Sequence, residues 1–252
     1  MPKFFQKYKK NLIASFVCLS LIACLVIANF VASSLIPTAK VITSAKSSPF
    51  ELYMISLSKS QVKSEAETLA KDYQQIGAGG YIWQIDEYYH VISSAYSNKN
   101  DAVLVQNSVK NKGIESELVK VSFPSIEIKG DFSESESKIL NKSLSCFQSY
   151  YLSLYDISIS YDTLVYNEIS ARLAINNAHS TLSSTLADFE TIFADACEIE
   201  PLNSFHNLLE NALSSSKSLC SAIPLFPEQT YSSLIKYRYL EILYLYKNFN
   251  SK

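Results

Sequence analysis

The stretch "IGAGGYIWQ", Ile76 to Gln84, decides how the middle of the chain folds, because it holds three of the five glycines in the 252-residue sequence. Apolar residues recur at helical spacing before it, in "VKSEAETLAKDYQQ", whereas "GYIWQI" and "YYHVISSAY" after it are strand-like. A phosphate-binding loop needs the opposite order, since the N-terminus of a following helix holds the anion. The glycines therefore predict a helix stop at Gly77 and a turn into a strand, and they argue against a nucleotide site.

The pattern extends on both sides of these glycines. The apolar run "FELYMISL" begins at Phe50, and a short turn at Asp86 and Glu87 separates the two strand-like runs. A second helical stretch, "DAVLVQNSVKNKG", ends at a glycine and is followed by "IESELVKV". The predicted order over residues 50–128 is β-α-β-β-α-β, in which two helices cover one face of a four-stranded sheet.

The second half of the chain has helical patterns only. "SESE", which starts at Ser133, is typical of a capping box, and Pro201 and Pro227 suit the first turns of later helices. Residues 131–252 are therefore predicted to form an all-α helical bundle, and the chain as a whole an α+β protein.

The predicted last helix is unusually rich in tyrosine. It contains more tyrosines than one buried stripe can hold, so either the helix packs on two sides or some of the rings serve a partner. The tyrosines are Tyr231, Tyr237, Tyr239, Tyr244 and Tyr246.

The N-terminus predicts a membrane anchor. Residues 1–10 carry four lysines and precede an uncharged run, and residues 11–37 are long enough to cross a hydrocarbon core of about 30 Å. A cleaved signal peptide has an apolar stretch of only about 7 to 15 residues. We therefore expect a cytoplasmic tail, an uncleaved single-pass transmembrane helix, a linker over residues 38–49 and an extracytoplasmic remainder. The sequence "LIAC" keeps open the alternative of a lipoprotein acylated at Cys24.

Composition and motif spacing argue against several other classes of function. The formal net charge of -2 gives no reason to expect nucleic acid as a partner. Cys146, Cys197 and Cys220 lie outside the apolar run without CxxC spacing, so one disulfide and buried thiols both remain open. The three histidines lack metal-ligand spacing and no nucleophile motif is present, so we expect no metal, no cofactor and no enzymatic activity.

The segment from Phe50 to Val121 resembles the SPOR domain (sporulation-related repeat), a module of bacterial envelope proteins. The resemblance rests on the β-α-β-β-α-β order and on "YMISL", "GAGGYI" and "YYHVISSAY". It implies binding of peptidoglycan glycan strands on the sheet face that the two helices leave open, and a link to cell division or sporulation.

By position, the resemblance assigns glycan-binding roles to Ser56, Tyr88, His90 and Leu118. Strand alternation places Tyr88 and His90 on one sheet face. The chain departs from the family pattern where a Gln-x-Gly-Ser-Phe run is expected, because it has "SLSKS" from Ser56 to Ser60. The resulting hypothesis is a membrane-anchored envelope protein that binds peptidoglycan glycan. The alternative is an envelope scaffold or assembly protein that acts through its helical bundle without affinity for glycan.

Overall fold

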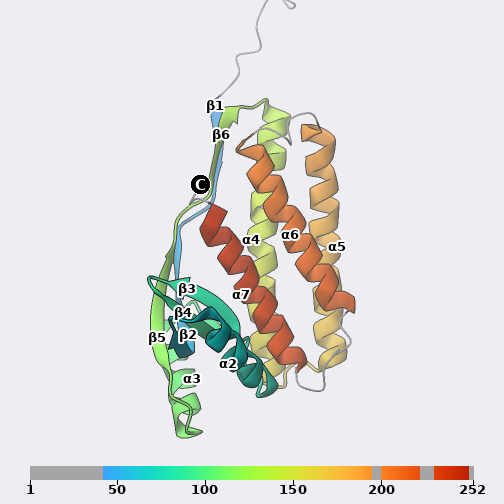
Figure 1. Ribbon diagram of the computed structural model, residues 1–252. Helices are drawn as coiled ribbons and strands as arrows, with labels where there is room; N and C mark the ends of the chain where they lie inside the picture. The colour runs from blue at the N-terminus through green and yellow to red at the C-terminus, as the bar shows by residue number, and fades with distance from the viewer. Residues whose placement is uncertain (1–41, 195–199, 222–229, 250–252) are drawn as a thin grey trace, which may run out of the picture. The chain divides into compact units, whose positions relative to one another are not determined.

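The computed structural model describes residues 42–194, 200–221 and 230–249. Among these residues no helix is long and apolar enough to cross a membrane, and the predicted transmembrane helix lies outside them. Figure 1 shows the elements, which in chain order are β1 (Ile42–Lys46), β2 (Phe50–Ser60), α2 (Lys63–Gln75), β3 (Tyr81–Ile85), β4 (Tyr88–Tyr96), α3 (Lys99–Asn111), β5 (Glu117–Phe123), β6 (Glu127–Asp131), α4 (Glu134–Asp162), α5 (Glu168–Phe193), α6 (Leu202–Ser221) and α7 (Tyr231–Phe249).

A small sheet domain precedes a helical region, as the sequence predicts. The sheet has the order β3-β4-β2-β5 with antiparallel neighbours, and both α2 and α3 contact it. Gly77 has a φ of 90°, and its N–H bonds to the carbonyl of Gln74 at 3.1 Å, which confirms the predicted helix stop. Asp86, with a φ of 54°, lies in the two-residue turn between β3 and β4.

The predicted linker contains structure of its own. Within residues 38–49, strand β1 pairs with β6 in a second, two-stranded sheet. The buried hydroxyl of Ser47 then accepts from the N–H of Ile126 at 2.7 Å and lies 2.7 Å from the hydroxyl of Tyr246. The linker prediction missed this strand because its pairing partner is distant in the sequence, so no local apolar pattern marks it.

The helical region begins as expected. The hydroxyl of Ser133 accepts from the N–H of Glu136 at 3.3 Å, and the Glu136 carboxylate accepts from the N–H of Ser133 at 2.6 Å, which completes a capping box. Helices α4, α5 and α6 pack in sequence, and α7 packs against both α4 and α6. The span between α4 and Phe193 is one long helix, α5.

Helix α7 also packs on the sheet, on the face opposite α2 and α3. Figure 1 shows it between the strands and the helices α4 and α6. Its ring contacts with the sheet include Tyr237 with Tyr81 at 5.1 Å, Tyr244 with Trp83 at 5.3 Å, and Tyr246 with Phe50 at 5.2 Å.

Two-sided packing therefore accounts for the tyrosine content of α7. Tyr231, Tyr239 and Tyr246 are buried, whereas Tyr237 and Tyr244 are half-buried at the edge of the sheet. The sheet and the bundle share one hydrophobic core. Much of the sheet face that the resemblance leaves open is thus covered by a helix of the same chain.

Candidate functional site

Polar side chains gather on this same sheet face, at the end where β2 finishes and β5 starts. The register places Ser56 beside both Ile92 of β4 and Glu117 of β5, and it places Lys59 beside His90. Partners across an antiparallel pair point to the same face, so three strands bring these groups together.

The centre of the cluster is a hydrogen-bonded imidazole. His90 Nδ1 lies 3.1 Å from Ser56 Oγ and 3.2 Å from Glu117 Oε1. The Ser56 hydroxyl donates to the carbonyl of Ser58 at 3.0 Å, and a carboxylate can only accept. We therefore assign the ring proton to Nδ1. Burial is the main cause that lowers the pKa of His90, so the ring is neutral near pH 7.

An exposed ion pair and an exposed aromatic ring lie on the solvent side of the His90 imidazole. Lys59 Nζ is 3.1 Å from Glu117 Oε2, and the two side chains are 48% and 43% exposed. The same ammonium group lies 5.7 Å from the centroid of the Tyr88 ring, which is itself 38% exposed. Exposed pairs of this kind contribute only about 0–1 kcal/mol to stability, so these groups remain available for binding.

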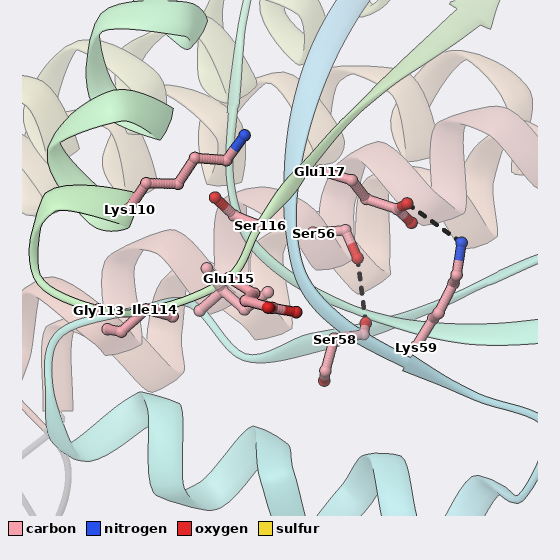
Figure 2. A pocket seen from close by; sticks show the side chains of 10 residues that line it. Ser56, Ser58, Lys59, Lys110, Gly113, Ile114, Glu115, Ser116 and Glu117 are labelled. Atoms are coloured by element: carbon pink, nitrogen blue, oxygen red, sulfur yellow. Dashed lines mark hydrogen bonds and ion pairs between the residues drawn. The ribbon is translucent and has the colours of Figure 1, made fainter.

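A pocket of about 650 Å³ opens beside the ion pair. Pairing of β2 with β5 stops at Ser56, so the next residues of β2 are paired with β4 alone and present a free strand edge. Figure 2 shows Lys110 reaching in from α3 and the pair of Lys59 and Glu117 on the far side. The hydroxyls of Ser58 and Ser116, which also line the pocket, are buried without a hydrogen-bond partner.

The structure brings together three of the four residues that the resemblance assigns to glycan binding. Ser56, at 1% exposed, and His90, at 6%, are buried, and His90 contacts Glu117, whereas Tyr88 reaches the surface. Leu118 is not part of the cluster. It pairs with Ile55 and packs in the core that faces α3. Strand alternation gives the face of the cluster to the neighbours of Leu118 in β5, so Leu118 lies apart from the other three residues.

Sequence reasoning missed Lys59 and Glu117. Both residues are ordinary charged positions in the sequence, and only the strand register makes them partners of His90 and Ser56. A prediction of the β2–β5 register would have revealed Glu117, since it pairs directly with Ser56.

Two thiols and one cluster of metal-ligating residue types lie elsewhere among the described residues. Cys146 and Cys220 are free thiols, and Cys197 lies outside the described residues. A cluster on α5 and α6 places the ligand atoms of one histidine and two glutamates within 4.8 Å of one another: Glu190, His206 and Glu210.

Comparisons with known proteins give one weak similarity. No family model matches the chain, and a search of curated proteins finds no match. Among solved structures, the chain is similar to the peptidoglycan binding domain of the B. subtilis cell wall lytic enzyme CwlC, with 25% sequence identity and a TM-score of 0.27. The similarity covers 30% of this chain and 95% of that domain.

Proposed function

We propose that this chain is a bacterial envelope protein that binds peptidoglycan glycan strands without cleaving them. The observation that carries the proposal is the convergence of Tyr88, Lys59 and Glu117 beside the pocket at the end of the sheet. The same proposal places the protein in the membrane by its apolar N-terminus, with the sheet and the bundle outside the cell.

The chemistry of the cluster suits a polymer of N-acetylated sugars. The C–H face of a sugar ring stacks on an aromatic ring such as Tyr88, while hydroxyl and acetamido groups need hydrogen-bond partners. The free edge of β2 beyond Ser56 supplies such partners. Lys59 and Lys110 supply positive charge for the carboxylates that glycan strands expose once their stem peptides are removed.

The buried residues of the cluster position the exposed ones. His90, which Ser56 contacts, holds one oxygen of the Glu117 carboxylate, and the other oxygen holds the Lys59 ammonium over Tyr88. Because Glu117 is held by two partners, we assign it a binding role and not that of a catalytic acid.

Helix α7 restricts where a glycan strand can bind. Trp83 is 2% exposed beneath Tyr244, so the middle of the face is closed to a ligand. Ile235, Leu240 and Leu243 of α7 are fully buried, so the helix is an integral part of the core and not a removable lid. The glycan would thus bind at the polar end of the sheet.

An assembly role through the bundle is the second candidate. At the α4–α5 turn, four large aliphatic side chains are 61% to 88% exposed, which favours contact with another protein. They are Leu164, Val165, Ile169 and Leu173.

Retention on insoluble peptidoglycan treated with an amidase to remove its stem peptides tests the proposal. The full chain is expected to co-sediment with this material, and Tyr88→Ala and Lys59→Ala are each expected to weaken retention roughly fivefold. Lys138→Ala, at an exposed lysine on α4, is the matched control and should behave as wild type. Retention no greater than that of an unrelated protein would leave the assembly role as the better explanation.

A further inference from the structure

A second cavity, of about 550 Å³, runs along the outer edge of β3 between α2 and α7. We call it the β3-edge groove. It lies apart from the cluster around His90 and shares no lining residue with the pocket there. Its aromatic lining consists of Tyr81, Tyr89, Tyr237 and Tyr244.

The groove has a free strand edge as its floor. β3 is the outermost strand of the four, and Ile85 and Tyr88 flank its two-residue turn. In such a hairpin the two residues that flank the turn form two backbone hydrogen bonds with each other. Because the direction of the backbone N–H and C=O groups alternates along a strand, those of Ile82 and Gln84 point away from β4. Both residues line the groove. It therefore offers unpaired N–H and C=O groups alongside its tyrosines.

The wall formed by α7 presents two tyrosines that are two helical turns apart. Tyr237 and Tyr244 are half-buried and are held against Tyr81, at 5.1 Å and 5.8 Å between ring centroids. Burial raises the pKa of Tyr81 and of Tyr237, so their phenols remain protonated donors at neutral pH. Fixed rings with a polar tip lose little conformational entropy when they bind a ligand.

The wall formed by α2 is polar and carries more positive than negative charge. Lys63 pairs with Glu67 at 3.7 Å, whereas Lys71 is exposed. Gln74 Nε2 donates to the carbonyl of Gly79 at 3.1 Å, which fixes the amide at the rim. The groove thus combines stacking rings, amides, backbone groups and an ammonium group.

We propose that the β3-edge groove is a second glycan subsite, which binds the same acidic polymer as the cluster at the end of the sheet. This inference rests on the proposed function. Gln84 of the groove pairs with Tyr89, and the residue immediately before Tyr89 is Tyr88 of the first site. A polymer that occupies both sites gains avidity from two weak contacts. The subsite exists because α7 covers the sheet and adds Tyr237 and Tyr244 beside β3.

The proposal also specifies the charge of the polymer. Lys71 and Lys63 favour strands whose carboxylates are exposed by removal of stem peptides over neutral chitin, which has similar sugars without carboxylates. Retention on amidase-treated peptidoglycan is therefore expected to exceed retention on chitin, and the difference should shrink as salt is raised.

The test compares variants of the two sites in the full chain, with amidase-treated peptidoglycan and chitin as the probes. Tyr237→Ala is expected to weaken retention on peptidoglycan roughly fivefold, from loss of one stacking ring. Tyr237→Ala also removes packing on Tyr81, so a loss of retention could come from a loss of structure. Gln84→Ala and Lys71→Ala change exposed side chains and are therefore expected to leave the fold intact. Lys71→Ala should reduce the preference over chitin, and Lys138→Ala should change nothing.

The outcomes separate this inference from the proposed function. If wild type binds and Tyr88→Ala weakens it, but Gln84→Ala, Lys71→Ala and Tyr237→Ala all bind as wild type, the second subsite is refuted while the function stands. If wild type itself does not bind, the proposed function fails and the subsite fails with it. Loss of binding in the groove variants with unchanged thermal unfolding establishes the subsite.

Discussion

Lys236 of α7 ties the bundle to the sheet domain, and its removal is the most informative perturbation of the fold. Its ammonium group lies 2.6 Å from Asp162 Oδ2 at the end of α4 and donates to the carbonyl of Gly77 at 2.9 Å. The Lys236 side chain is 12% exposed and that of Asp162 35%. Ser232 also donates to Asp162. One cation therefore joins α7, α4 and the turn that precedes β3.

Lys236→Met keeps the length of the side chain and removes its charge. Removing one partner of a fully buried pair costs about 3–5 kcal/mol, and of an exposed pair about 0–1 kcal/mol. In the variant, Asp162 still accepts the hydrogen bond from Ser232 and still contacts some solvent, so the cost is smaller than for a fully buried pair. The carbonyl of Gly77 loses its donor, which costs about 1 kcal/mol. We expect the free energy of unfolding to fall by about 2–3 kcal/mol, and the urea midpoint by about 1 M.

The chain contains a matched control. Lys142 lies 2.6 Å from Asp188 Oδ2, so the residue types and the distance are the same, but these side chains are 52% and 46% exposed. Lys142→Met should cost less than about 1 kcal/mol. Urea unfolding of the two Met variants, with Asp162→Asn to complete a double-mutant cycle for Lys236, measures the difference. Equal costs for the two lysines would refute the reasoning, since burial would then contribute nothing.

Two further predictions concern the sheet. Gly79→Ala would place a Cβ 2.9 Å from both Leu240 Cδ1 and the carbonyl of Ser93. We therefore expect the free energy of unfolding to fall by about 1–3 kcal/mol, measured by thermal unfolding. An unchanged melting temperature would contradict this close approach. Because burial lowers the pKa of His90 from 6.5, the unfolded chain binds more protons than the folded one as the pH falls below about 6.5. The free energy of unfolding should therefore decrease as the pH falls from 6.5 to 5. In unfolding measured from pH 8 to pH 5, His90→Gln should show a smaller dependence of this free energy on pH than the wild type. An equal dependence in the two proteins would exclude His90 as its source.

The candidate site was only partly predictable. The resemblance assigned Tyr88, His90 and Ser56 by position, and strand alternation, which can be read from local sequence, put Tyr88 and His90 on one face. Lys59 and Glu117 could not be found in this way, because their roles follow from the register of three strands. The position of Leu118 on the other sheet face has the same origin, since a shift of one residue moves a side chain to the opposite face.

The amino-acid sequence by itself determined the β-α-β-β-α-β order of the sheet domain and the helical character of the region after it, but it did not mark β1 or β6. The stop at Gly77 and the cap at Ser133 depend on contacts within a few residues, so local chemistry is sufficient to specify them. The tertiary structure alone decided that α7 covers the sheet. That contact joins Lys236 to Gly77, which are 159 positions apart in the sequence. The spacing of apolar residues along a helix indicates that one face is buried, but it does not indicate which element covers that face. The same packing closes the middle of the predicted binding face and creates the β3-edge groove, because the tyrosines of α7 have two surfaces to fill.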